Sequence, residues 1–239
     1  MAMNEPFDMR RSDRRLFAAV AILFPIIVLI GFAPTYYLKF AFGDAPLPSL
    51  LVHLHGFCMT MWIALFITQV FLISSKRIKV HQRLGIFGLI LAPMIVIVGW
   101  MTGIAAAARG SAPPDIPPLS FLIVPFGDMV VFAILFSGAM YYRRKPADHK
   151  RLMLLTVLNF LPPAIGRFPT ELANSPLFFF GVPDALAITF LISDTWKNRK
   201  VNMVFLAGMV LLIASHIIRL TVASTDTWLR FAAWLTSWA

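Results

Sequence analysis

Seven apolar runs, most of them about 20 residues long, dominate this chain. A helix needs about 20 apolar residues to cross a hydrocarbon core of ~30 Å. Only 13% of the 239 residues are charged, against about 25% in a typical soluble domain. We therefore predict an all-α, polytopic membrane helix bundle with seven transmembrane helices. The expected spans are 17–38, 49–73, 84–108, 119–142, 152–168, 177–196 and 201–224.

No polar stretch is long enough to fold separately, so residues 1–239 are expected to form a single integral-membrane domain. It comprises a basic N-terminal segment (1–16), the bundle (17–224) and a tail (225–239). The first apolar run is too long for a signal-peptide core and is interpreted as a retained helix. The tail carries four large aromatic residues: Trp228, Phe231, Trp234 and Trp238. These predict an amphipathic helix at the outer membrane interface, with a frayed chain end as the alternative.

The basic residues alternate with the spans. The N-terminal segment and the second-to-third, fourth-to-fifth and sixth-to-seventh loops carry four, four, five and three Lys or Arg, and the opposite side receives Lys39, Arg109, Arg167, Arg219 and Arg230. This pattern predicts a cytoplasmic N-terminus and an outer C-terminus in a cell inner membrane. It also explains the net charge of +10 without nucleic acid, so the expected partner is a lipid bilayer.

Prolines mark the two least regular spans. Pro162 and Pro163 interrupt the fifth run, and Pro183 lies early in the sixth. Proline removes a backbone donor and leaves carbonyls that need other partners at membrane depth. Both places are therefore expected to be bent and covered by protein, with the fifth and sixth helices packed inside the bundle.

Two basic loops resemble each other. Residues 76–84 align with residues 144–152, and each segment has a basic pair followed by His-[Gln/Lys]-Arg-Leu at the start of the next helix. The aligned histidines are His81 and His149. The chain is thus interpreted as one leading helix followed by three helical hairpins, two of them alike.

These strings carry a resemblance. The sequence His-Lys-Arg-Leu-Met at 149–153, its twin at His81 and His-x-His-Gly at 53–56 resemble uncharacterised bacterial multi-pass membrane proteins of the predicted haem-binding and cytochrome-oxidase-associated kind. The resemblance covers the second to fifth helices. It implies a haem or metal site and a respiratory complex or quinone as partner, and it supplies no mechanism.

Five helices each place a polar group in one layer of the outer half. At a rise of 1.5 Å per residue, these groups lie about 9–14 Å from the outer ends of their helices. A charged side chain at mid-membrane costs about 2.5–3.5 kcal/mol or more, so such groups are expected to face the bundle interior and meet a partner. The five residues are His55, Asp128, Asn159, Asp184 and His216.

Besides a proton path between its protonatable groups, three interpretations of this layer stay open. Structural ion pairs, Asp184–Arg219 and Asp128–Arg167, satisfy every charge without any further function. A small ion such as iron, copper or zinc would take a nitrogen–oxygen set, namely His55, Asp128, Asp184 and His216.

The third interpretation is a b-type haem held between two helices. Its ligands would be His55 and His216, with Arg167 and Arg219 facing the propionates. His53 is about 200° from His55 around the helix, so only one of the two can face the site. The residue chosen is His55, which is followed by Gly56.

His81 and His149 form a second candidate site at the cytoplasmic edge. They would either ligate an inner-leaflet haem or contact lipid phosphates, since several cations surround them. The leading functional hypothesis is a membrane redox protein with a b-type haem or a His/Asp-bound metal ion in the outer half of the bundle. Its alternatives are a proton-coupled carrier or lipid- or anion-binding protein without a cofactor, and a non-catalytic accessory subunit of a respiratory complex. No enzyme class is assigned.

Overall fold

The structure, a computed structural model, describes residues 11–42 and 49–239, with side chains from residue 14 onward except residue 174. Arg10 and the side chain of Arg11, which contribute to the basic N-terminal segment, lie outside the described residues. The part of the chain that is described consists of helices and connecting turns and contains no strand. This confirms the all-α class predicted from the sequence.

Six helices among the described residues are long and apolar enough to cross a membrane. The first, α1, continues as a short π-helix, η1 (Ala33–Tyr37), before the four-residue α2 (Lys39–Phe42). The fourth is preceded by the four-residue α5 (Pro118–Phe121). The six are α1 (Arg11–Phe32), α3 (Leu50–Ser74), α4 (Ile78–Ala108), α6 (Ile123–Tyr141), α9 (Pro176–Asn198) and α10 (Met203–Val222).

The expected fifth span is a shorter, broken element. Helix α7 (Pro146–Asn159) ends just before Pro162, where the four-residue α8 (Pro162–Ile165) begins. Proline at the first turn of α8 forfeits no intrahelical hydrogen bond, whereas it could not continue α7. Every residue of α7 from Arg151 to Asn159 except Met153 is buried. The break at Pro162 and the burial of this element are therefore confirmed.

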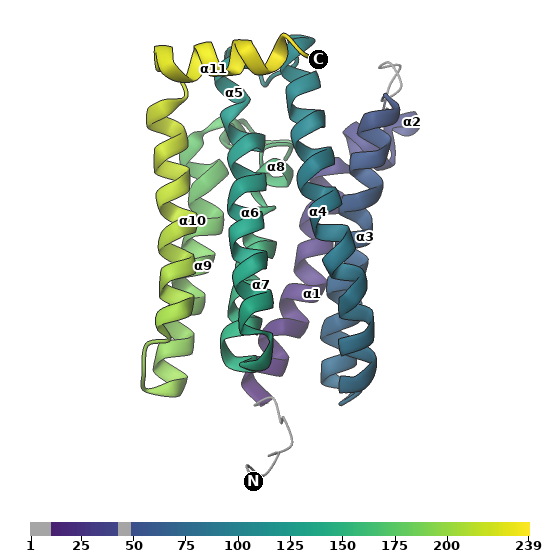
Figure 1. The fold of residues 1–239 in the computed structure, drawn as a ribbon, viewed down its shortest axis with the longest axis vertical. Coiled ribbons are helices and arrows are strands. Elements are labelled where there is room, and N and C mark those ends of the chain that lie inside the picture. The colour runs from purple at the N-terminus through teal and green to yellow at the C-terminus, as the bar shows by residue number, and fades with distance from the viewer. Residues whose placement is uncertain (1–10, 43–48) are drawn as a thin grey trace.

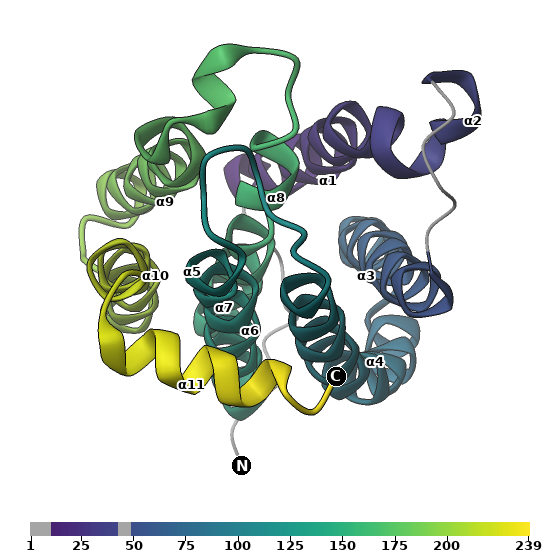
Figure 2. The same ribbon diagram turned by 90° about the horizontal axis from the view of Figure 1, so that it is seen from above.

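The helices are arranged around α7 (Figures 1 and 2). Helices α3 and α4 stand on one side of the bundle, α9 and α10 stand on the opposite side, and α6 and α7 run between them. Helix α1 packs against α3 and α8. The centre is closed by an aromatic cluster in which Trp62 of α3 packs against Phe132 and Phe136 of α6, and Phe132 packs against Phe160.

The two ends of the bundle differ in charge. The turns α3–α4, α6–α7 and α9–α10 lie at the end where α1 begins (Figure 1). We call this the basic end, because its turns and helix starts carry the predicted Lys and Arg clusters of residues 76–83, 143–151 and 197–200. At the other end a short 3-10 helix, η3 (Glu171–Asn174), precedes α9.

The tail forms an ordered helix across that other end, the α11 end. Thr225 accepts a hydrogen bond from the backbone N–H of Trp228 and so caps α11 (Asp226–Thr236). The helix lies across the bundle from α10 toward α4 (Figure 1). Trp228 and Ala232 are buried against α5, and the Trp228 indole donates to the carbonyl of Leu119 at 2.9 Å. The alternative of a frayed chain end was wrong.

Helix α9 departs from expectation. Its buried residues are Phe180, Pro183 and Ala187, and most of its surface faces outward. The expectation that α9 packs inside the bundle was therefore wrong, because α7 occupies the centre. Pro183 is covered as predicted, but the helix continues through it without a break.

Candidate functional site

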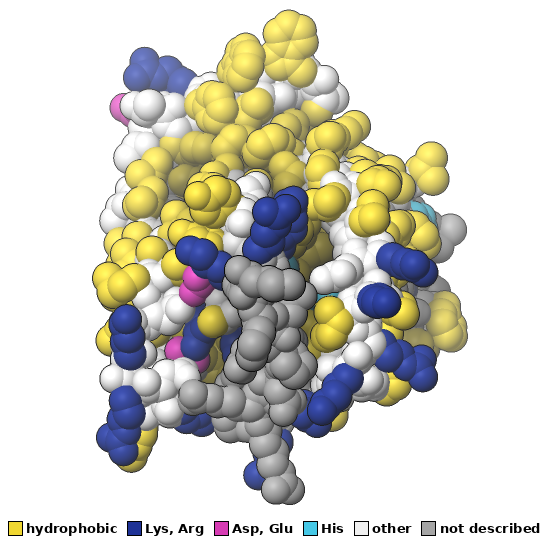
Figure 3. All heavy atoms as spheres, turned by 60° about the horizontal axis from the view of Figure 1, so that its bottom comes forward, with side chains coloured by type: hydrophobic (Ala, Val, Ile, Leu, Met, Phe, Trp, Pro, Cys, Tyr) yellow, Lys and Arg dark blue, Asp and Glu magenta, His cyan; other side chains and the backbone are white. Residues whose placement is uncertain are grey.

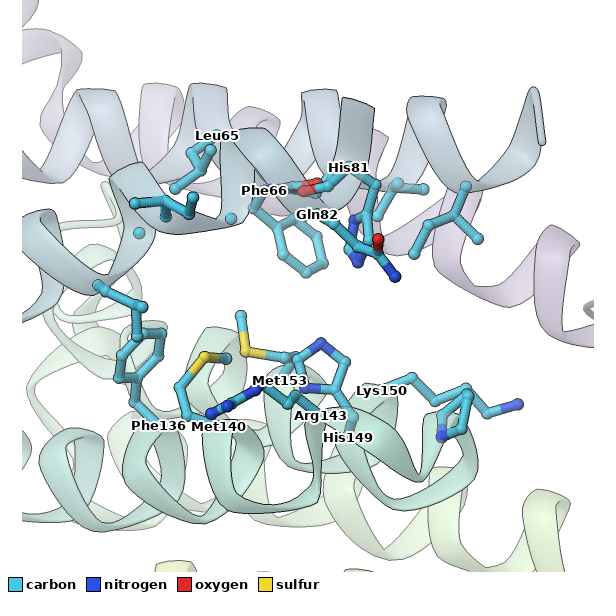
Figure 4. Close-up of a pocket in the computed structure, with 18 of the residues that line it drawn as sticks. Leu65, Phe66, His81, Gln82, Phe136, Met140, Arg143, His149, Lys150 and Met153 are labelled. Carbon is cyan, nitrogen blue, oxygen red and sulfur yellow. Dashed lines mark hydrogen bonds between the residues drawn. The ribbon is translucent and has the colours of Figure 1, made fainter. Parts of the chain in front are cut away.

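A cavity of about 790 Å³ opens at the basic end, between the α3–α4 hairpin and the α6–α7 hairpin. Its walls are largely apolar and include Phe66, Phe136, Met140 and Met153. Figure 4 shows the side chains of α3 and α4 on one side of an open gap and those of α6 and α7 on the other. The cavity is thus a slot between two helical layers.

One histidine projects from each layer of this slot. His81 is the fourth residue of α4 and His149 is the fourth residue of α7, so the two similar loops place their histidines at equivalent positions. Both side chains line the cavity, on opposite sides of the gap (Figure 4). Their ring centroids are 6.5 Å apart and the ring planes are inclined by 76°.

Hydrogen bonding fixes the tautomer of one of these rings. The Nδ1 atom of His149 lies 2.8 Å from the carbonyl oxygen of Ala139 on α6. A carbonyl only accepts, so Nδ1 carries the proton and Nε2 of the neutral ring keeps a free lone pair. The Nδ1 atom of His81 is buried without a hydrogen-bond partner among the described residues, and the backbone carbonyl of His81 accepts from Gln69 at 3.3 Å.

The mouth of the slot is basic. Arg143, Arg144 and Lys150 all contribute to its lining. Figure 3 views the molecule with this end forward and shows Lys and Arg side chains around the hollow. The slot therefore combines an apolar interior, two imidazoles and a rim that attracts anionic groups.

A second group of polar side chains lies deeper, toward the α11 end. Asp128 of α6 forms an ion pair with Arg219 of α10, and the two side chains are only 2% and 3% exposed. The Asn159 side chain at the end of α7 donates to the backbone carbonyl of Asp128 at 2.9 Å. Arg219 also donates to the hydroxyl of Ser215 at 2.8 Å.

His216 joins this group through α9. Its Nδ1 atom lies 2.8 Å from Oδ1 of Asp184, and its ring stacks on Phe180 with centroids 4.4 Å apart. Its Nε2 atom is buried and has no hydrogen-bond partner among the described residues, and the same holds for Oδ1 of Asn159 and Nε of Arg219. We call the five residues Asp128, Asn159, Asp184, His216 and Arg219 the polar cluster. Four members of the predicted polar layer thus meet in space, joined by Arg219.

The fifth member, His55, lies elsewhere. Its helix α3 packs against α1 and α4, whereas α10 packs against α6, α7 and α9, so α3 and α10 stand on opposite sides of the bundle (Figure 2). The structure does not bring His55 and His216 together, and the haem geometry expected for that pair is not formed. The depth estimate was sound, but depth along a helix carries no information about which helices are neighbours.

The arginine pairing also differs from expectation. Arg167 donates to the carbonyl of Pro163 at 2.6 Å and lies over the ring of Phe32, 4.5 Å from its centroid; its guanidinium also acts electrostatically on His55. The expected pairs Asp128–Arg167 and Asp184–Arg219 were therefore wrong. Asp128 takes Arg219, because both project between α6 and α10, and Asp184 takes His216.

His53 points to the outside of the bundle. It is exposed, and its ring lies 5.7 Å from that of Tyr36 in η1. No group of three or more His, Cys, Asp or Glu side chains arranged to hold a metal ion occurs in the described residues. The expected metal set of His55, Asp128, Asp184 and His216 fails, because His55 is on another helix pair and Arg219 already occupies the Asp128 carboxylate.

One buried ion pair escaped sequence analysis. Arg151 of α7 makes two hydrogen bonds to the Asp194 carboxylate of α9, at 2.7 and 3.0 Å, and the two side chains are 8% and 11% exposed. From the sequence, Arg151 is counted among the five basic residues of the fourth-to-fifth loop. The available signal was its position two residues after His149, one to two turns inside α7 rather than in the loop.

No protein-family model, curated protein or solved structure matches this chain. The slot and the polar cluster are therefore the features of the chain that bear on its function.

Proposed function

We propose that this chain is a multi-pass membrane redox protein that holds one b-type haem in the slot at the basic end, with His81 and His149 as the two axial ligands. The observation that carries the proposal is the placement of two imidazoles on opposite walls of one slot, with centroids 6.5 Å apart. When bound, haem supplies one-electron redox chemistry. The chain's own residues bind it, orient it and shield it.

The separation of the rings suits a shared iron. A metal–nitrogen bond is about 2 Å long, and a ring centroid lies about 1 Å behind its nitrogen, so two imidazoles on opposite sides of one metal have centroids about 6 Å apart. The observed 6.5 Å is close to this value.

The hydrogen bond of His149 prepares it as a ligand. Metal-binding histidines usually donate their second ring N–H to a carbonyl or carboxylate, which fixes the ring and raises its basicity. The contact from Nδ1 of His149 to the Ala139 carbonyl has this form. Nε2 is thereby left to face the slot.

The number of protein ligands favours haem over a bare ion. Two histidines alone do not complete the four-coordinate sphere that zinc takes, and no third donor joins them to form a metal-binding group within the described residues. A porphyrin brings four nitrogens of its own and needs only the two axial ligands. The slot's apolar walls and its volume of about 790 Å³ suit a flat macrocycle.

The rim would meet the two propionates. Arg143, Arg144 and Lys150 line the same cavity as the histidines, and guanidinium–carboxylate contacts are among the stronger hydrogen bonds in proteins. The haem of this proposal is therefore at the basic end. It replaces the outer-half site expected between His55 and His216.

We propose seven membrane spans, of which α7 and α8 together form the fifth. The basic end would lie on the cytoplasmic side of the inner membrane. The support is the gathering of Lys and Arg at one end of the bundle. Single cysteines at Lys79, Lys145 and Lys197, in a Cys58→Ser background, should all be shielded from an impermeant thiol reagent in intact cells. Labelling of any one of them from outside contradicts this topology.

The optical spectrum of the purified protein tests the haem. The wild type is expected to show a Soret band that shifts on dithionite reduction, with close to one haem per chain by pyridine haemochrome assay. His81→Ala and His149→Ala should each lose or strongly weaken the band. His53→Ala and His55→Ala are matched controls and should retain it. A wild type that stays colourless after expression with added haem precursor overturns the proposal.

One other occupant has a specific observation in its favour. The basic rim above an apolar interior also suits an anionic lipid, with its phosphate at Arg143 and Arg144 and its chains in the slot. In that case the colourless protein would retain anionic phospholipid through purification, detected by mass spectrometry. The Arg143→Gln, Arg144→Gln double variant would lose this lipid, whereas His149→Ala would keep it.

A further inference from the structure

The charges of the polar cluster do not balance. Asp128 and Asp184 contribute two carboxylates, and Arg219 contributes one permanent cation. With His216 neutral, the group carries one net negative charge among side chains that are 2%, 19%, 3% and 2% exposed for Asp128, Asp184, Arg219 and His216. An uncompensated charge in such surroundings is strongly unfavourable.

One added proton removes this charge. His216 is placed to hold this proton, because its Nδ1 contacts Asp184 on α9 at 2.8 Å and its charge also acts on Asp128 of α6. Arg219, on the same helix as His216, is already paired with Asp128. The remaining neighbour, α7, contributes the uncharged Asn159 to this region. Among the residues that the structure describes, these are the charged groups of the cluster that face His216.

The unpaired atoms of the cluster point to a second occupant. Three of its atoms are buried and find no hydrogen-bond partner in the part of the chain that the structure describes: Nε2 of His216, Oδ1 of Asn159 and Nε of Arg219. Buried polar atoms are nearly always hydrogen-bonded, and internal water commonly supplies the missing partner. A donor at Nε2, which the protonated imidazole provides, would give such a water molecule a proton to accept.

We propose that the polar cluster is a proton-binding site: it takes up one proton, held on His216 between the Asp184 carboxylate and buried water. Asp184 has the most exposed side chain of the group, so the proton enters and leaves through its carboxylate. A proton that arrives on the Asp184 carboxylate forms an O–H bond there, and this bond breaks as Nδ1 of His216 takes the proton while Nε2 keeps the proton of the neutral ring. The site does not depend on the haem proposal, because it lies near the opposite end of α7.

The test is ¹⁵N NMR of the histidine side chains in the full-length protein, kept reduced with dithionite so that any haem iron is low-spin and diamagnetic. The His216 signal is assigned by its loss in His216→Gln. If that variant does not fold, single replacement of His53, His55, His81 and His149 assigns it by elimination. At pH 7 the wild type is expected to show both His216 nitrogens protonated.

Asp184→Asn removes the second carboxylate and should convert His216 to the neutral ring at pH 7. Asp194→Asn is the matched control, because Asp194 lies on the same helix and pairs with Arg151 instead; it should leave the His216 signal unchanged. A neutral His216 in the wild type at pH 7, or an imidazolium that persists in Asp184→Asn, overturns the proposal. Neither result bears on whether the slot binds haem.

Discussion

His149 and His216 have similar hydrogen bonds but different surroundings. In each, Nδ1 lies 2.8 Å from a fixed oxygen, the Ala139 carbonyl for His149 and the Asp184 carboxylate for His216. His149 then faces a cavity of about 790 Å³, whereas His216 is 1% exposed and stacked on Phe180. The hydrogen bond decides which nitrogen is available, and the surrounding space decides what we propose that it binds: a macrocycle for His149 and a proton for His216.

Helix α7 contributes a residue to both the slot and the polar cluster. His149 and Asn159 are ten residues apart, about 15 Å along the helix axis. Trp62 and Phe136 line the slot and belong to the aromatic cluster that reaches Phe160, the residue after Asn159. This cluster separates the open slot from the closed polar cluster, so substitutions in one region should leave the other largely intact.

The largest expected effect comes from breaking the buried ion pair of the polar cluster. Arg219→Met leaves the Asp128 carboxylate buried without its cation, which costs about 3–5 kcal/mol of unfolding free energy in such pairs. Thermal unfolding of the detergent-solubilised protein should show a large drop in transition temperature. Haem content in the molecules that remain folded should be unchanged.

Arg144→Met is the matched control for this loss. Arg144 is exposed at the rim of the slot, and surface substitutions usually change stability by no more than about 0.5 kcal/mol. If Arg219→Met were as stable as Arg144→Met, the polar cluster would not be the tightly paired region described above.

Filling the slot should have a smaller effect, and it should lower haem binding while leaving the polar cluster unchanged. Gly85 lines it, and a Cβ placed there meets only the Gln69 side chain, at 3.8 Å, so Gly85→Phe should project a ring into the space proposed for haem. Overpacking costs about 1–3 kcal/mol, which corresponds to roughly 5- to 150-fold weaker binding. Haem per chain should fall while the His216 ¹⁵N signal stays unchanged.

Ile90→Phe tests whether that loss is specific. Ile90 is on the same helix, 59% exposed and outside the slot lining, so the variant should bind haem normally. Equal haem loss in the two variants would mean that the slot is not the binding site.

The sequence predicted the elements of both regions better than their partners. The helical class, the break at Pro162 and the common depth of Asp128, Asn159, Asp184 and His216 followed from hydropathy, proline chemistry and helical rise. Those quantities are local to one helix. They do not say which helices pack against each other, and the expected pairing of His55 with His216 failed for this reason.

The slot was closer to prediction because its two histidines lie in similar hairpins. An internal repeat indicates which distant segments are structurally equivalent, since similar segments pack in similar ways. Residues 76–84 and 144–152 place His81 and His149 at the same position of their helices. The pairing of Arg151 with Asp194 lacked any such signal. It depends on α9 lying against α7, which only the assembled fold determines.

The smallest expected effect concerns the rim. Arg143→Gln with Arg144→Gln should weaken haem binding by up to about fivefold per residue, because exposed charge pairs contribute about 0.2–1 kcal/mol each. The loss should shrink as ionic strength rises. Arg77→Gln with Lys79→Gln, at the same end but outside the slot lining, should have no effect. Equal losses in both double variants would indicate a general charge effect instead of propionate binding.

Electron paramagnetic resonance of the oxidised protein tests most directly whether His81 and His149 share one haem iron. His81 and His149 would each supply one imidazole, and a ferric haem held by two imidazoles would give a low-spin signal. We expect that signal in the wild type and its conversion to a high-spin signal in any haem retained by His81→Ala or His149→Ala. A high-spin wild type, or a low-spin signal that survives in His149→Ala, would contradict the account.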